Sequence, residues 1–208
     1  MIQTLRKRFP VLILCAVLLA ALCGCQEQSE YQDQNLFPDF PLSSESIASM
    51  EAMYGKTLEE VGEEWGFSEE ELTERLKGIW YLKKPAVIRE KQFTQSLRTH
   101  LSSDTFYSLE YICHCASAEE TADLAEALYA DLVEAYGEPI HDEESGVNYL
   151  YREGAFDAIR NPEDDKFHAR YGQWENIGEF SQFTMNINTW QAQEIYTILL
   201  TYRVYRDE

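Results

Sequence analysis

The chain has 208 residues, of which 45% are hydrophobic and 13% aromatic, so it carries enough apolar surface to bury a core rather than remain disordered. Its 37 acidic residues against 17 basic ones give a net charge of −20 at pH 7. A surface of this sign repels phosphate backbones, which argues against nucleic acid as a partner.

The first 24 residues have the three parts of a secretory signal peptide. Arg6, Lys7 and Arg8 form a basic start, and residues 9–22 form an apolar run that only Pro10 interrupts. The alternative is a transmembrane helix, but the run is shorter than the roughly 20 apolar residues that span a bilayer. No basic cluster follows it. The pattern therefore predicts a signal peptide over residues 1–24.

The motif Leu22-Cys23-Gly24-Cys25 resembles the bacterial lipobox, in which a small residue precedes the lipidated cysteine and an aliphatic residue stands three positions before it. The resemblance implies that a diacylglyceryl group is added to the thiol of Cys25 and that the chain is then cut before this residue. Two acyl chains on one residue are enough for stable anchoring. The protein is thus expected on the extracytoplasmic face of a bacterial cell membrane, bound through the lipid at Cys25.

Residues 25–43 are polar, contain Pro38 and Pro41, and follow neither a helical nor a strand period, so they are predicted to form a flexible tether. An ordered arm that uses Phe37 and Phe40 is the alternative. Residues 44–208 are then predicted to form one globular domain, with two similar halves, 44–115 and 116–208, as a further possibility.

Helices are predicted at the start of this domain. Apolar residues with helical spacing begin at Ile47, and Gly55 ends the pattern. Thr57 with Glu60 makes a capping box for a second helix, which ends at Gly66. Ser68 with Glu71 makes another capping box and predicts a short helix up to Gly78.

From residue 79 the apolar period changes to two, which predicts strands near 79–83, 86–99 and 104–115. Ser117 with Glu120 then caps a long amphipathic helix that ends at Gly137. A strand near 147–151, a polar loop over 161–174 and a closing antiparallel hairpin that uses residues 183–187 and 195–205 follow.

This order of helices, strands, helix and strands predicts an α+β fold, an antiparallel sheet with helices packed on one face. The stretch 56–115, which opens with KTLEEVGEEWG, resembles small lipoprotein modules of the SmpA/OmlA type and modules like the β-lactamase inhibitor protein. The resemblance implies protein binding rather than catalysis.

Cys113-His114-Cys115 contains residue types that bind zinc, but on a strand the two cysteines face one side and His114 the other. Two buried thiols are therefore the preferred interpretation, with a strained disulfide or a metal site as alternatives. The acidic stretches 141–144 and 163–165 are predicted to be solvated loops, and weak calcium binding is the alternative. No metal, cofactor or catalytic residue is predicted.

Trp174 and Trp190 lie at or beside predicted loops and are the two aromatic residues that we expect to line a groove, if the domain has one. The leading functional hypothesis is an anchored module that binds a protein or an envelope component. The alternatives are an envelope hydrolase, which would use carboxylates around Asp142 or Glu163 with a histidine in a loop-lined cleft, and a transporter's substrate-binding subunit. The chain is small for the two lobes of the latter.

Overall fold

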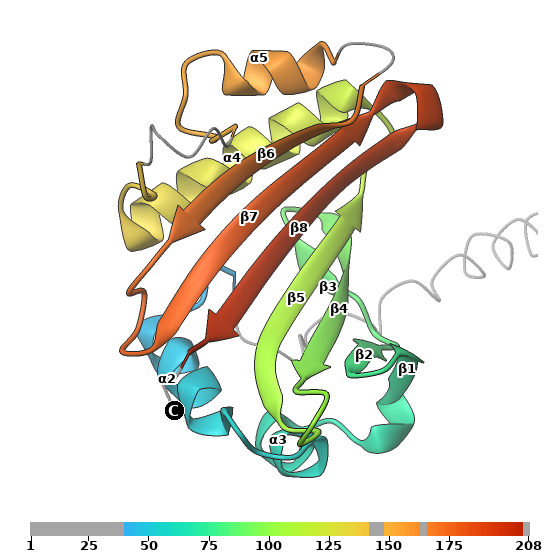
Figure 1. The fold of residues 1–208 in the computed structure, drawn as a ribbon, viewed down its shortest axis with the longest axis vertical. Coiled ribbons are helices and arrows are strands. Elements are labelled where there is room, and N and C mark those ends of the chain that lie inside the picture. The colour runs from blue at the N-terminus through green and yellow to red at the C-terminus, as the bar shows by residue number, and fades with distance from the viewer. Residues whose placement is uncertain (1–39, 142–147, 163–165, 206–208) are drawn as a thin grey trace, which may run out of the picture. The chain divides into compact units, whose positions relative to one another are not determined.

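A computed structural model describes residues 40–141, 148–162 and 166–205. These residues form an α+β fold that an antiparallel sheet dominates, as the sequence predicted (Figure 1). The helices are α2 (Ser44–Met53), α3 (Leu58–Trp65), α4 (Ala118–Tyr136) and α5 (Ala155–Arg160). The strands are β1 (Leu72–Leu76), β2 (Ile79–Leu82), β3 (Ala86–Ile88), β4 (Lys91–Thr99), β5 (Phe106–His114), β6 (His168–Trp174), β7 (Ser181–Trp190) and β8 (Ile195–Val204).

The strands lie in the order β1-β2-β4-β5-β8-β7-β6, and β3 pairs with β4 outside this path. All these pairings are antiparallel. The central pair, β5 with β8, runs from Ser108↔Arg203 to His114↔Thr197 and joins the strands of the first half of the domain to those of the second. The described residues therefore share one sheet rather than two separate ones.

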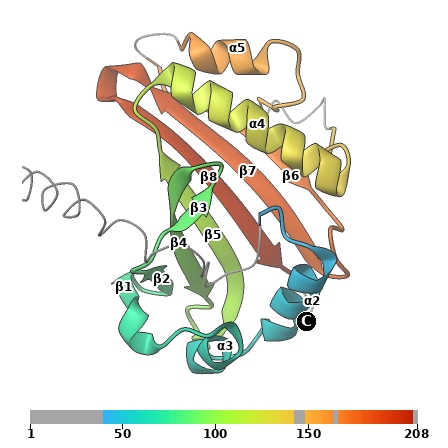
Figure 2. The ribbon, with the colours of Figure 1, turned by 180° about the vertical axis from the view of Figure 1, so that it is seen from behind.

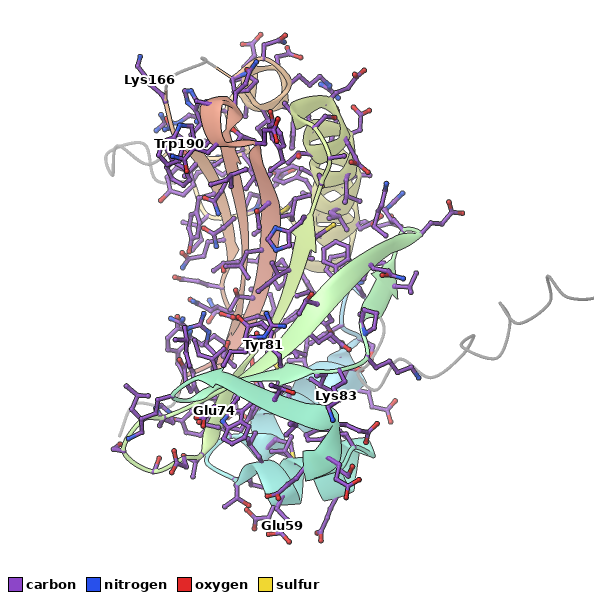
Figure 3. All side chains as sticks on the ribbon, turned by 90° about the vertical axis from the view of Figure 1, so that its right-hand side faces the viewer. Glu59, Glu74, Tyr81, Lys83, Lys166 and Trp190 are labelled. Atoms are coloured by element: carbon purple, nitrogen blue, oxygen red, sulfur yellow. The ribbon has the colours of Figure 1, made fainter. Side chains whose placement is uncertain are left out.

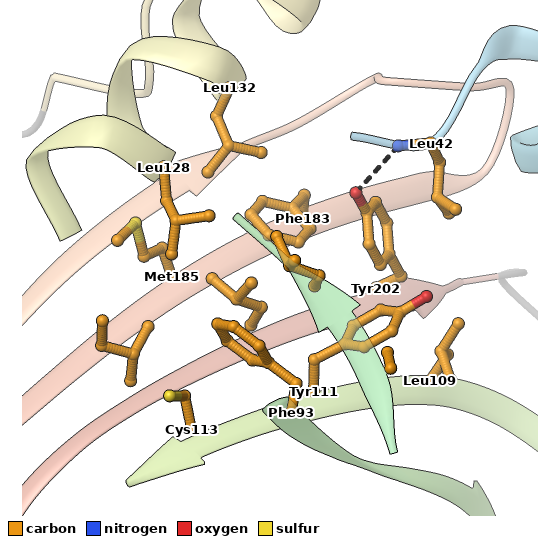
Figure 4. Close-up of a cluster of buried hydrophobic side chains, with 14 of the residues drawn as sticks. Leu42, Phe93, Leu109, Tyr111, Cys113, Leu128, Leu132, Phe183, Met185 and Tyr202 are labelled. Atoms are coloured by element: carbon orange, nitrogen blue, oxygen red, sulfur yellow. Dashed lines mark hydrogen bonds between the residues drawn. The ribbon is translucent and has the colours of Figure 1, made fainter. Parts of the chain in front are cut away.

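Helix α4 covers one face of the sheet (Figure 2). The hydroxyl of Ser117 accepts a hydrogen bond from the backbone N–H of Glu120 at 3.1 Å, so the predicted cap is present. The apolar side of the helix, which includes Leu128 and Leu132, packs over inward-facing residues of β7 and β8 such as Met185 (Figure 4). This contact forms the hydrophobic core.

Helices α2 and α3 confirm the two predicted starts. Ser43 caps α2, and Thr57 and Glu60 make both hydrogen bonds of the capping box at α3. Gly66 ends α3 with φ of 78°, a left-handed conformation that glycine adopts without a steric penalty. Among the described residues no helix is both long enough and apolar enough to cross a bilayer.

The segment just before α2 belongs to the domain. Leu42 is 3% exposed, and Phe40 packs against Phe183 with ring centroids 6.3 Å apart. The backbone N–H of Leu42 donates to the hydroxyl of Tyr202 at 3.1 Å (Figure 4), and its carbonyl accepts from the hydroxyl of Tyr136 at 2.9 Å. Residues 40–43, predicted as tether, therefore form part of the ordered arm that was the alternative, while Phe37 lies outside the described residues.

The short helix predicted from Ser68 to Gly78 is wrong. The capping box forms, but only a turn of 3₁₀ helix follows it at residues 69–71, and the chain then enters β1. Gly78 has φ of 75° and makes the tight turn into β2, where the register pairs Leu72 with Leu82. Strand pairing overrides the helix propensity of this Glu-rich stretch.

The strand predicted over 86–99 is a hairpin of β3 and β4. Arg89 and Glu90 form its two-residue turn with φ of 47° and 63°. Positive φ at both central positions is typical of hairpin turns whose twist matches that of the strands. The turn was missed because neither residue is the glycine or asparagine that usually marks such a position.

The region between α4 and β7 also differs from the prediction. In place of a strand at 147–151, the described part of this segment makes a single bridge, between Tyr149 and Tyr171. Helix α5 was not predicted, and β6 occupies much of the expected loop 161–174. The polar residues of β6 conceal its period, because the outer face of this edge strand is solvated.

The hydroxyl of Tyr202 is predicted to hold the N-terminal arm in place. Tyr202→Phe leaves the buried N–H of Leu42 without its acceptor and is expected to lower the free energy of unfolding by about 1–2 kcal/mol. Hydrogen exchange at the Leu42 amide is expected to accelerate. Tyr196→Phe, half-buried on the same strand, is the control; equal losses of stability in both variants would contradict this role of Tyr202.

Candidate functional site

In Figure 1 the face of the sheet turned away from α4 is not covered by any of the described helices. We call this surface the open face. The cross-strand register places on it mainly hydroxyl, amide and aromatic side chains. On strands β4, β5, β8, β7 and β6 its residues are Thr94, Ser96, Arg98, Ser108, Glu110, Ile112, His114, Ala169, Tyr171, Gln173, Gln182, Thr184, Asn186, Asn188, Trp190, Ile195, Thr197, Leu199, Thr201 and Arg203. The small or paired side chains among them, Ser96, Ser108, Glu110, Thr184 and Thr201, are buried between their neighbours, and most of the others are half-buried.

Among the strand residues of the open face, Glu110 has the one carboxylate, although the chain has 37 acidic residues; exposed Glu175 follows at the end of β6 beside Gln173. Glu110 is buried, and its Oε1 lies 2.6 Å from Nε of Arg98 on the neighbouring strand. Ser96 donates to the other oxygen at 3.2 Å. Burial works against the charge of Arg98, but the ion pair with Glu110 outweighs it and raises the pKa of this guanidinium. The open face therefore lacks the strong negative charge of the protein as a whole.

Arg203 lies on β8 beside this ion pair. Its guanidinium carbon lies 5.8 Å from the ring centroid of Tyr107 and 5.9 Å from that of Tyr205. Such contacts attract a cation to the ring face. The guanidinium group of Arg203 therefore lies between two aromatic rings.

A hydrogen-bonded chain of polar side chains runs along β6. The hydroxyl of Tyr171 donates to Oε1 of Gln173 at 2.6 Å, and Nε2 of Gln173 donates to Glu175 at 2.8 Å. Burial raises the pKa of Tyr171 to about 12, so its hydroxyl stays protonated at neutral pH and remains a donor. These interactions fix the orientation of the amide group of Gln173.

A hollow of about 770 Å³ lies at the end of the sheet where β6 turns into β7. Its lining residues are Glu175, Asn176, Glu179, Phe180, Ser181, Gln182 and Tyr205. Glu51 of α2 supports this end by accepting hydrogen bonds from the Phe180 N–H and the Ser181 hydroxyl, both at 2.7 Å. At Gly178 a Cβ atom would lie 2.5 Å from Cγ2 of Ile47, so only glycine permits the close approach of α2.

The two candidate tryptophans lie in different environments. Trp174 is 1% exposed and its indole N–H donates to the carbonyl of Gly137 at 2.8 Å, so the expectation that it lines a groove is wrong. It was misjudged because β6 was taken for a loop. Trp190 is half-buried at the end of β7 on the side away from α4 (Figure 3), and its ring packs edge-on against exposed Phe167.

The cysteines and histidines of the described residues show no metal-binding arrangement. Cys113 points into the core, whereas exposed His114 points outward and contacts Thr197 on β8. No group of three possible metal ligands occurs among the described residues. His141 stacks on Tyr151 with ring centroids 4.0 Å apart. Three predicted features, Cys25 and the acidic residues 142–144 and 163–165, lie outside the described part of the chain.

The chain was compared with known proteins by sequence and by structure. No protein-family model, curated protein or solved structure matches the chain. The argument for function therefore depends on the open face and on the sequence.

The ion pair on the open face generates a prediction of stability. Glu110→Gln removes the charge that compensates Arg98 and is expected to lower the free energy of unfolding by about 1–3 kcal/mol, because a partly buried guanidinium loses its partner. Urea denaturation of this variant beside Glu64→Gln, an exposed position on α3, measures the difference. A Glu110→Gln variant no less stable than the control would show that the pair contributes nothing.

Proposed function

We propose that the protein is a lipid-anchored extracytoplasmic module that binds another protein through its open face. The observation that carries the proposal is the contrast between that face, where one carboxylate is already paired, and a chain of net charge −20. Depletion of charged residues is characteristic of the centre of protein interfaces, where aromatic residues and arginine are enriched. The open face has Arg98, Arg203, Tyr171 and Trp190.

The shape of the surface favours a macromolecule over a small ligand. Small-molecule sites are concave and mostly apolar. The open face instead extends across five strands, β4, β5, β8, β7 and β6, with hydrogen-bonding groups such as Asn186 and Asn188 on neighbouring positions of one strand. A protein partner with a polar, weakly charged surface fits such a face, and another envelope component, such as a glycan, is the second possible ligand.

The proposed location rests on the lipobox-like motif. Membrane-extracted protein is expected to have a mature mass that begins at Cys25 and includes a diacylglyceryl group. Cys25→Ala should abolish this modification, so that the variant is either released or retained as precursor. Intact-mass measurement of both proteins distinguishes these states; an unmodified wild-type protein would remove the basis for membrane anchoring.

The proposed binding surface can be tested in cells with a photo-reactive amino acid at Asn188 on the open face. A matched probe at Ala130, exposed on α4, serves as the control. We expect covalent adducts from position 188 only, and we expect Asn186→Arg to reduce them at least about tenfold, because a bulky charge then occupies the centre of the face.

Protease treatment of the adduct identifies the class of partner. An adduct that protease shortens contains protein, as proposed, whereas a protease-resistant adduct that glycan-cleaving enzymes shorten would replace the protein with an envelope polysaccharide. Equal adducts from positions 188 and 130, or adducts that Asn186→Arg leaves unchanged, would contradict binding by the open face.

A further inference from the structure

Cys113 and Cys115 lie at the end of β5, beside the start of α4, and neither forms a disulfide. Their side chains project to the same side of the strand and are joined by a hydrogen bond between the two sulfur groups. Cys113 is 3% exposed and packs in the core (Figure 4), whereas Cys115 is half-buried. One thiol of the pair is therefore accessible and the other is protected behind it.

The surroundings of Cys115 favour its thiolate. The hydrogen bond from Cys113 lowers the pKa of Cys115 more than burial raises it, and a hydrogen bond with Thr121 and, more weakly, the charge of Lys91 also lower it, to about 7. The carboxylate of Glu120 opposes this effect but is itself paired with Lys91. Cys113 has the opposite shift, because its donated hydrogen bond and its burial both raise its pKa. A thiolate close to a lysine and a helix N-terminus is a typical reactive cysteine.

Joining the two sulfurs requires a local change of the backbone, because Cβ atoms that project in parallel from a strand lie farther apart than the roughly 3.5–4.5 Å found in disulfides. Residues two apart on a strand are separated by about 6.6 Å, near the upper end of the Cα separations found in disulfides. Cys115 follows the last residue of β5, and its N–H still bonds to the carbonyl of Tyr196 at 2.8 Å. Only the end of the strand has to adjust when the bond forms.

We infer that Cys113 and Cys115 form a redox-active dithiol in which Cys115 reacts first with disulfide-bearing molecules and Cys113 resolves the product. In the first step the Cys115 thiolate attacks one sulfur of the disulfide, forming a mixed disulfide and releasing one thiolate. In the second step Cys113 loses its proton and attacks the Cys115 sulfur, and the second thiol leaves. The protein loses two electrons and two protons, and the disulfide that Cys115 attacked is reduced to two thiols.

The probe for this reaction is oxidised glutathione, added to reduced full-chain protein extracted from membranes. Trypsin cleavage after Arg98 and Arg152 gives a peptide with Cys113 and Cys115 as its only cysteines. In the wild-type protein we expect this peptide to lose the mass of two hydrogen atoms. Cys113→Ser should stop at the mixed disulfide on Cys115, and Cys115→Ser should react at least about tenfold more slowly.

Because Cys113→Ser places a hydroxyl in the core, Cys113→Ala and the unmodified protein supply independent measurements. Alkylation of wild-type Cys115 by iodoacetamide should rise with pH to half its maximum near pH 7, since the thiolate is the nucleophile. The same protein unfolded in guanidinium should show the ordinary midpoint, about pH 8.5. A folded midpoint equal to the unfolded one, a mixed disulfide that persists in the wild-type protein, or faster reaction of Cys113 would overturn the inference.

Discussion

The pairing of β5 with β8 is the contact on which the rest of the fold depends. Their register, from Ser108↔Arg203 to His114↔Thr197, joins strands about ninety residues apart in the chain and makes one sheet from two groups of strands. A slip of one residue would turn Tyr202 onto the open face and Thr201 into the core, because side chains alternate with a period of two. The pairing is therefore strongly specified by burial.

Tyr202 shows how much depends on this register. Its ring contacts Phe183, with centroids 4.4 Å apart, and packs edge-on against Tyr111 of the neighbouring strand. Its hydroxyl, fully buried, accepts the hydrogen bond of Leu42 and approaches the hydroxyl of Tyr136 at the end of α4. One side chain thus links the N-terminal arm, the sheet and the covering helix.

The same register that builds the core also arranges the open face, because every second residue of the central strands points there. The carboxylates of the domain lie largely elsewhere, on solvated helix surfaces such as that of α4, which carries Glu119, Asp123 and Glu126. A rigid sheet orders the side chains of the open face before any partner arrives, which reduces the entropy lost on binding. The cysteine pair lies at the end of β5, just before the start of α4.

Local signals in the sequence identified several elements well. The capping boxes at Thr57 and Ser117 predicted where α3 and α4 begin, and the apolar period of two predicted a strand near 104–115, where β5 lies. The same kind of signal failed at Ser68, where a real capping box leads into a strand. It also failed for Trp174, whose burial depends on the unexpected strand β6.

The amino-acid sequence by itself determined the α+β class, the acidic charge, the helix starts and the alternating faces of the main strands, since these depend on residues within a few positions of one another. The tertiary structure alone decided which strands are neighbours, that none of the described helices covers one face of the sheet, and that Trp174 is buried while Trp190 is half-buried. Those features follow from contacts such as Tyr202 with Leu42, 160 residues apart. Local periodicity does not determine such contacts, because many strand orders are compatible with the same pattern of apolar residues.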